Sequence, residues 1–339
     1  MQPGDKPPTL KTIAELTGLS LSTVSLSLRD PSKLKQDTND KVEQAARQVG
    51  YVPNRAGVRL RTGRTNVLAL VLANDKNTID YTRLLVQGIG AQIRGTEYHL
   101  NVVPDFGGGD PVEAVQYVLE NRTADGIILN HTTPRDPRVQ MLMEAGFPFV
   151  SHGRTEFYTP HAFHDFHSER YIQMAVARLL SKGRRHILLA AVDNRNTNYI
   201  NIINAFQTAI AQSGVYNVQG DVVRPTDVLH SAAAARAYGR ALATRAQPYD
   251  AIICSDELTG LALIYGLKDG DAHLGRDYDL ISKQTSDILP VLYPETDTVA
   301  EDFFAAGGEL ARLLMVRIDG QPPQSLQSYQ EPVPSWSID

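Results

Sequence analysis

Apolar residues at helical spacing begin near residue 10. In the first stretch they are Leu10, Ile13, Ala14 and Leu16, and their spacing predicts an amphipathic helix. Thr9 stands directly before this stretch and can cap the helix, since its hydroxyl can accept an otherwise unpaired backbone N–H. Gly18 follows and tolerates the left-handed conformation that ends many helices.

A second and a third helix are predicted directly after this one. Ser20 is a candidate cap for the second helix, which should bury Val24 and Leu28. The third helix should run from about 38 to 49. Its predicted inward residues are Val42, Ala45, Ala46 and Val49. Two short helices joined at a glycine turn predict a helix-turn-helix, whose second helix can enter a DNA major groove. The pattern alone also allows a plain three-helix bundle.

Beyond Arg64 the pattern changes to short apolar strands that alternate with amphipathic helices. We predict strands over 67–72, 99–103, 126–129, 148–151, 186–191, 221–224, 251–254 and 280–282. We predict helices over 81–94, 112–121, 169–181, 200–212, 232–245 and 259–267. This alternation is typical of parallel sheets with crossover helices. The stretch is too long for one doubly wound sheet, so we expect two similar lobes.

Charge separates the same two regions. Residues 1–64 carry a net charge of +5, although the whole chain carries −5, so the remainder carries −10. A basic head on an acidic body suits a nucleic-acid-binding region attached to a sensor, although a solvated basic face would look the same. The chain starts with a polar, proline-rich segment without the apolar core of an export signal, and no apolar run reaches the length of a membrane helix. We therefore expect a cytoplasmic protein that is nucleoid-associated when bound to DNA. The lone cysteine, Cys254, excludes an internal disulfide.

The head resembles the lac/galactose repressor family of bacterial transcriptional regulators. The resemblance rests on the run TIAELTGLSLSTVSLSL and on KVEQAARQVGYVPNRAGVRLRTGRTNVLALVL, which together cover most of residues 9–72. It implies an all-α helix-turn-helix head and an α/β, two-lobed, periplasmic-binding-protein-like body built from parallel doubly wound sheets. It also implies a DNA-binding domain over 1–52, a hinge helix and linker over 53–64, and an effector-binding and dimerisation domain over 65–339.

The resemblance assigns DNA contacts residue by residue. Leu21, Ser22 and Leu26 match base-reading positions, and Leu60 matches a leucine that wedges into the minor groove at the end of a hinge helix. The full set of expected DNA-binding residues is Thr9, Ser20, Leu21, Ser22, Thr23, Ser25, Leu26, Arg29, Lys35, Asn54, Arg55, Gly57, Leu60 and Arg61. Two of them depart from the family pattern. Leu26 cannot hydrogen bond to guanine but can contact a thymine methyl, and Gly57 weakens the hinge helix by roughly 1 kcal/mol relative to alanine.

Ligands of open parallel sheets gather at the carboxyl ends of strands. The residues that we expect to bind the ligand are Asp75, Tyr81, His131, His152, Arg154, Asp193, Asn201, Asp256 and Gln284. Such amides, carboxylates and rings suit a polyhydroxylated molecule, because each hydroxyl both donates and accepts. Phe163 is a further candidate for stacking on the ligand. However, Ile202 stands where relatives place an arginine, and Ser282-Lys283-Gln284-Thr285 replaces a motif that contains aspartate. A sugar or sugar derivative is favoured, and other polar metabolites stay open.

The expected function is that of a homodimeric repressor of a catabolic or transport operon. It would bind pseudo-palindromic operator DNA under control of a small effector, with no cofactor and no metal. The alternative is an enzyme that acts on a polar metabolite through His131, His152 and Asp165. The nearby His161, His164 and His167 lie in a segment that we predict to be a loop or strand edge, and no catalytic motif accompanies them.

Overall fold

The computed structural model describes residues 8–52, 59, 63–73, 80–105, 110–193, 195–224 and 229–337. The chain separates into two compact units, Met1–Thr65 and Asn66–Asp339.

The first unit holds the three predicted helices, α1 (Leu10–Thr17), α2 (Leu21–Arg29) and α3 (Gln36–Val49), with a 3-10 turn, η1 (Pro31–Lys33), before α3. Thr9 caps α1 by accepting the backbone N–H of Thr12, and Gly18 ends it with a φ of 69°. Ser20 caps α2 by accepting the N–H of Thr23 at 3.1 Å. The helices bury a small apolar core made of Ile13, Val24, Val42, Ala45 and Ala46. The predicted helix-turn-helix pattern therefore folds as a packed unit.

One predicted core position of this unit is wrong, since Leu28 is 37% exposed. Val49, predicted to face inward, is half-buried and packs against the core, whereas Leu16, one of the apolar residues at helical spacing in α1, is 53% exposed. In α2 the buried neighbour of Val24 is Ser27, whose hydroxyl donates to Asn39 Oδ1 at 2.8 Å. A helix turns about 100° per residue, so the side chain that follows Ser27 lies beyond the contact with α3.

The second unit contains two six-stranded sheets. The first sheet has the order β11-β5-β4-β3-β1-β2, with β1 (Val67–Ala73), β2 (His99–Asp105), β3 (Gly126–Leu129), β4 (Phe149–His152), β5 (Phe163–Phe166) and β11 (Gln327–Gln330). The second has the order β12-β10-β9-β8-β6-β7, with β6 (His186–Ala190), β7 (Gln219–Val222), β8 (Ala251–Cys254), β9 (Asp279–Gln284), β10 (Asp297–Ala300) and β12 (Val333–Pro334). All pairings are parallel except that of β10 with β12.

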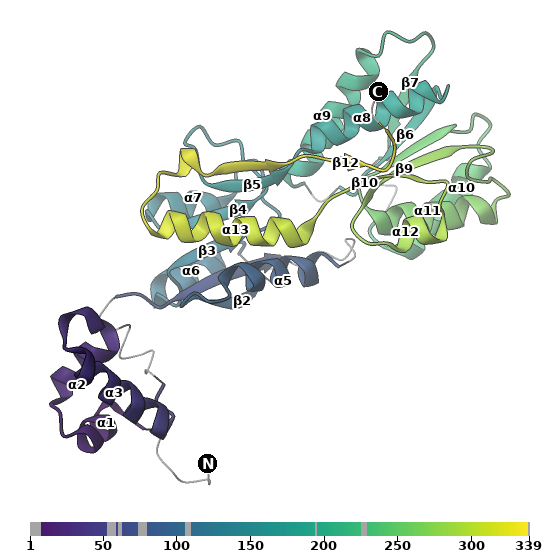
Figure 1. The fold of residues 1–339 in the computed structure, drawn as a ribbon. Coiled ribbons are helices and arrows are strands. Elements are labelled where there is room, and N and C mark those ends of the chain that lie inside the picture. The colour runs from purple at the N-terminus through teal and green to yellow at the C-terminus, as the bar shows by residue number, and fades with distance from the viewer. Residues whose placement is uncertain are drawn as a thin grey trace. The chain divides into compact units, whose positions relative to one another are not determined.

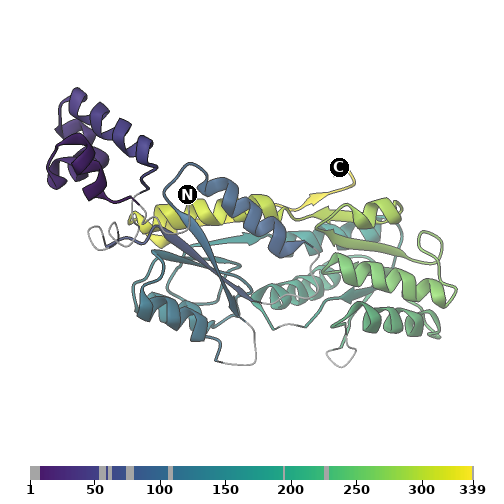
Figure 2. The ribbon, with the colours of Figure 1, turned by 90° about the horizontal axis from the view of Figure 1, so that it is seen from below.

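Helices cover both faces of each sheet, which gives two doubly wound lobes (Figures 1 and 2). In lobe 1, α5 (Tyr81–Ile93) and α13 (Phe303–Ile318) cover one face, and α6 (Glu113–Asn121) and α7 (Pro137–Glu144) cover the other. In lobe 2, α8 (Ser168–Ser181) and α9 (Thr197–Ala211) cover one face, and α10 (Ala232–Ala243) and α11 (Glu257–Asp269) cover the other. The short α12 (Ile288–Leu292) follows β9. The predicted fold class is confirmed.

The chain passes between the lobes after β5, after β10 and again after β11. The sequence analysis did not predict β5, β10, β11, β12, α7, α12 or α13. The segment from His161 to His167 was predicted to be a loop or strand edge, and this was wrong. It contains β5, which lies between β4 and β11 with all four residues buried. A strand covered on both faces usually reads as a near-continuous apolar run. FHDF does not, because His164 and Asp165 occupy two of its four buried positions, so the local pattern did not indicate a strand.

Glycines allow two helix pairs to pack closely. A Cβ added to Gly88 in α5 would lie 2.0 Å from the backbone oxygen of Phe304 in α13. A Cβ on Gly266 in α11 would lie 2.0 Å from the backbone oxygen of Arg236 in α10. Each lobe therefore holds one helix pair whose backbones approach too closely for any larger residue.

Across the described residues, no helix combines the length and apolar character that spanning a membrane would require.

Candidate functional site

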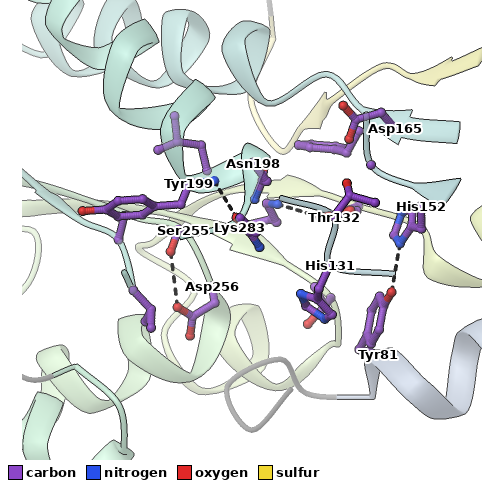
Figure 3. Close-up of a pocket in the computed structure, with 18 of the residues that line it drawn as sticks. Tyr81, His131, Thr132, His152, Asp165, Asn198, Tyr199, Ser255, Asp256 and Lys283 are labelled. Carbon is purple, nitrogen blue, oxygen red and sulfur yellow. Dashed lines mark hydrogen bonds and ion pairs between the residues drawn. The ribbon is translucent and has the colours of Figure 1, made fainter. Parts of the chain in front are cut away.

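A cavity of about 500 Å³ lies between the two lobes of the second unit (Figure 3). Tyr81, His131 and His152 stand on one side in Figure 3, and Ser255 and Asp256 on the other. The lining comes mainly from residues at or just beyond the carboxyl ends of parallel strands, where open α/β sheets bind ligands. It comprises Ala73, Tyr81, His131, Thr132, His152, Gly153, Arg154, Asp165, Phe166, Ala191, Val192, Asp193, Asn196, Asn198, Tyr199, Ile202, His230, Ser255, Asp256, Lys283, Thr285, Glu301 and Phe303.

Most of the expected ligand-binding residues come together in this cavity. Those that line it are Tyr81, His131, His152, Arg154, Asp193 and Asp256. Asn201 and Gln284 are not among its lining residues, and Asp75 lies outside the described residues. The Gln284 side chain instead accepts a hydrogen bond from the Thr298 hydroxyl at 2.7 Å. Phe163 is buried in lobe 1 and packs on Tyr329, so it does not line the cavity.

Aromatic and imidazole rings form the lobe 1 wall. The Tyr81 hydroxyl lies 3.0 Å from His152 Nδ1, and the two rings are stacked with centroids 5.8 Å apart. His131 and Phe303 each meet the Tyr81 ring edge-on. Burial lowers the pKa of His152 well below its usual value, and the neighbouring His164, His131 and Lys283 lower it further. His152 is therefore neutral at pH 7 and offers one donor and one acceptor nitrogen.

Arg154 connects the two lobes. It follows β4 in lobe 1, and its guanidinium forms an ion pair with Glu169 in the first turn of α8 in lobe 2. It also donates to the Tyr329 hydroxyl at 3.3 Å and lies 3.6 Å from the carboxylate of Asp165. A second link joins the lobes where Thr197, at the start of α9, donates its backbone N–H to the carbonyl oxygen of Thr132 at 2.9 Å. The two lobes therefore meet through polar contacts beside the cavity.

A buried ion pair and a helix cap form part of the lobe 2 wall. Lys283 Nζ on β9 lies 2.7 Å from Glu301 Oε2, just beyond β10, and over the ring of Phe166 at 4.7 Å. Asp256 caps α11 by accepting the N–H and the hydroxyl of Thr259, both at 2.8 Å. Asp256 is thus structural as well as cavity-lining.

Three charged residues that line the cavity, Asp165, Lys283 and Glu301, were not predicted as ligand-binding residues. Lys283 was noted only as a departure from the family, and Asp165 only within the enzyme alternative. Glu301 was missed because β10, which positions it, was not predicted. Ile202 was also noted as a departure, and its side chain does line the cavity. An apolar residue therefore lines the cavity at the position where relatives place an arginine.

The three residues of the enzyme alternative, His131, His152 and Asp165, all line this cavity. None of the described residues form a group of three or more His, Cys, Asp or Glu side chains that could hold a metal ion. Burial raises the pKa of Asp165 to about 6 even though Arg154 acts to lower it.

Most of the expected DNA-contacting residues that the structure describes in the first unit belong to α2 or its N-cap, whereas Thr9 precedes α1 and Lys35 precedes α3. Leu21 is 51% exposed, and Ser22 is exposed beside it. The Ser20 hydroxyl lies 2.8 Å from the Ser22 hydroxyl and 2.7 Å from that of Thr23. Thr9, Arg29 and Lys35 are exposed as well, whereas Ser25 and Leu26 are half-buried. The remaining expected residues, Asn54, Arg55, Gly57, Leu60 and Arg61, lie outside the described residues.

The sequence matches two family models. Residues 9–54 match the model of bacterial regulatory proteins of the lacI family, and residues 176–335 match a periplasmic binding protein-like domain. The chain is 27% identical to the HTH-type transcriptional regulator CelR of Thermobifida fusca, over 94% of each chain. It is also 27% identical to the HTH-type transcriptional regulator RafR of Escherichia coli, over 96% of each chain.

Solved structures share the whole fold. A lac repressor dimer bound to operator and the anti-inducer ONPF matches with a TM-score of 0.80 at 18% identity, over 97% of this chain and 98% of that one. A complex of the transcriptional regulator CelR with cellobiose matches with a TM-score of 0.68 at 24% identity, over 97% and 98% of the two chains. Three findings lead to one assignment: the helix-turn-helix head, the two-lobed body, and the relatives that match along nearly the whole chain. The chain belongs to the lacI family of bacterial regulatory proteins and is a DNA-binding transcriptional regulator rather than an enzyme.

Proposed function

We propose that this protein is a homodimeric repressor whose binding to a pseudo-palindromic operator is controlled by a sugar or sugar derivative held between its two lobes. The single observation that carries the proposal is the polar cavity of about 500 Å³, lined from both lobes. Its volume lies within the roughly 300–1,000 Å³ typical of small-molecule sites. The cellobiose complex of CelR supports a sugar as the class of ligand.

We assign operator contact to the exposed side of α2. Leu21 and Ser22 are free to reach base edges, while the Ser20 and Thr23 hydroxyls suit phosphate oxygens. A two-fold dimer presents two copies of α2 to two half-sites. We divide the chain into a DNA-binding domain over 1–52, a hinge over 53–64 and an effector domain over 65–339. Operator DNA lies in the bacterial cytoplasm, which we propose as the place of action.

Ligand and DNA binding should be coupled through the lobes. A ligand that touches both lobes favours one relative lobe orientation, since the lobes meet through few polar contacts such as Arg154 with Glu169. The affinities for ligand and operator then change reciprocally, typically by 1–3 kcal/mol. An inducer would release the operator, and a co-repressor would strengthen its binding.

The test uses DNA selected from random sequence by the full-length protein. Footprinting should show two symmetric half-sites, and fluorescence anisotropy should show that cellobiose or another neutral sugar of a panel changes operator affinity. A single asymmetric half-site bound by a monomer would contradict the dimer. Operator binding that no sugar changes would contradict sugar control.

Two variants separate the ligand site from DNA binding. Arg154→Ala removes a cavity residue and one contact between the lobes, so the readout is the change that the sugar causes in operator affinity, which this variant should lose. For Asp256 the informative change is Asp256→Asn, because asparagine keeps the cap on α11 that alanine would remove. A response to sugar that survives in both variants would show that other residues line the ligand site.

A further inference from the structure

One buried carboxylate in the cavity lacks the hydrogen bonds that burial normally demands. Asp165 on β5 is 8% exposed and borders the cavity. Its nearest cationic atom is Arg154 Nε at 3.6 Å, which is longer than an N–H···O hydrogen bond. In the described parts of the chain, no donor lies within hydrogen-bond distance of its side chain. Since Asp165 lines the cavity, its carboxylate oxygens keep their acceptor capacity for a molecule that enters the cavity.

The two cations near Asp165 are already engaged by other groups. Arg154 pairs with Glu169 and with the Tyr329 hydroxyl. Lys283 pairs with Glu301 at 2.7 Å and lies over the ring of Phe166. Neither ion pair leaves a cation free to satisfy Asp165.

The remaining lining limits the charge of the ligand. An anionic group would meet Asp165, Glu301 and the further carboxylates of Asp193 and Asp256. A cationic group would meet Arg154 and Lys283. A hydroxyl group avoids both penalties, because it can donate to a carboxylate and accept from a neutral donor. His152 presents such a neutral ring on the adjacent strand, β4, where it pairs in register with His164 beside Asp165.

We infer that Asp165 anchors the effector by accepting hydrogen bonds from its hydroxyl groups, and that the site thereby selects uncharged polyhydroxylated ligands over acidic ones. This inference rests on the proposed control by a sugar and names the charge class of that sugar. Asp165 also lies at the end of the first segment that passes from lobe 1 to lobe 2. A ligand bound there touches the connection between the lobes.

The test uses calorimetry on the full-length protein to compare cellobiose with cellobionate, its aldonic acid, in which C1 is a carboxylate and the reducing-end ring is open. The neutral alditol, cellobiitol, has the same open chain without the charge and controls for the ring opening. The wild type should bind cellobiose at least tenfold more tightly than cellobionate. Asp165→Asn keeps the shape but replaces one acceptor oxygen with a donor. It should lose about 10- to 100-fold in affinity for cellobiose, as expected when hydrogen bonds to a charged acceptor are removed. In Asp165→Asn the ratio of the affinity for cellobiose to the affinity for cellobionate should also be smaller than in the wild type.

Asp271→Asn is the matched control. Asp271 is exposed and has a φ of 68°, which asparagine tolerates, so the same charge is removed outside the cavity. Its ligand affinities should not change. Unchanged affinity of Asp165→Asn for cellobiose, or a wild type that prefers cellobionate, would overturn the inference. If either result is found and a neutral sugar still changes the operator affinity of the wild type, the proposed function stands and only the role of Asp165 is wrong. If no neutral sugar in the panel binds the wild type, sugar control and this inference both fall.

Discussion

Helix α2 of the first unit and the cavity of the second unit present polar side chains in opposite ways. The hydroxyls of Ser20, Ser22 and Thr23 come from one short segment at the start of α2, where Ser20 and Ser22 are exposed and Thr23 is half-buried. The charged groups of the cavity come from β5, β9 and the segments after β4, β6, β8 and β10, and most of them are buried. Substitutions on α2 should therefore change binding with little effect on folding. Substitutions in the cavity should change both.

The largest expected effect on stability comes from breaking the buried pair of Lys283 and Glu301. Lys283→Met leaves the Glu301 carboxylate uncompensated, so the free energy of unfolding should fall by about 3–5 kcal/mol. Glu301→Met in the same chain should recover most of that loss, because two apolar side chains replace two buried charges. Chemical denaturation of both variants measures this. Equal stability of the single and double variants would show that the pair is not energetically coupled.

The next effect concerns the packing of α5 against α13. Gly88→Ala should lower the free energy of unfolding by about 1–3 kcal/mol or more, since its Cβ would overlap the Phe304 backbone. Gly90 lies in the same helix, and a Cβ there would meet nothing within 4 Å. Gly90→Ala should therefore be neutral or stabilising by up to about 1 kcal/mol. Similar denaturation midpoints for the two variants would contradict the close packing.

A smaller effect should depend on pH. Burial raises the pKa of Asp165 to about 6, above its ordinary value of 3.8, with Glu301 and Glu169 adding to the rise and Arg154 and Lys283 opposing it. Ionised Asp165 therefore lowers stability at pH 7.5, and this loss disappears as pH falls below about 4. Asp165→Asn should raise the free energy of unfolding at pH 7.5 by about 1–2 kcal/mol. The gain should be clearly smaller at pH 4.5, which lies between the unfolded and folded pKa values of Asp165. A stabilisation that is the same at both pH values would exclude this ionisation as its cause.

The smallest effect on stability is expected on α2. Leu21→Ala removes an exposed side chain, so the free energy of unfolding should change by less than about 0.5 kcal/mol. Operator affinity should nevertheless fall by about 1–3 kcal/mol, with altered base preference at one position of each half-site. Val24→Ala is the buried counterpart in the same helix and should lose about 0.5–2 kcal/mol or more of folding free energy. Selection of operator sequences by both variants, with thermal unfolding, separates the two roles. A Leu21→Ala protein that keeps its base preference would remove Leu21 from the contact surface.

Sequence alone determined the local elements whose signals lie within a few residues. Thr9 and Gly18 delimit α1 by a cap and a left-handed turn, and both were predicted. The apolar strands β3 and β8 were predicted with their observed bounds, because a short apolar run between turns needs no distant partner to be recognised. The resemblance to the family followed from two runs of sequence near the start of the chain.

Only the tertiary structure decided what lines the cavity. The sequence FHDF forms a strand because β4 and β11 flank it, and β11 lies far along the chain. Glu301 meets Lys283 because β10 pairs with β9 in parallel register, and Gln284 points to Thr298 for the same reason. Side chains alternate between the two faces of a strand. Which residue of a strand end enters the cavity therefore depends on register, and register is set by pairing with strands that a local pattern does not contain.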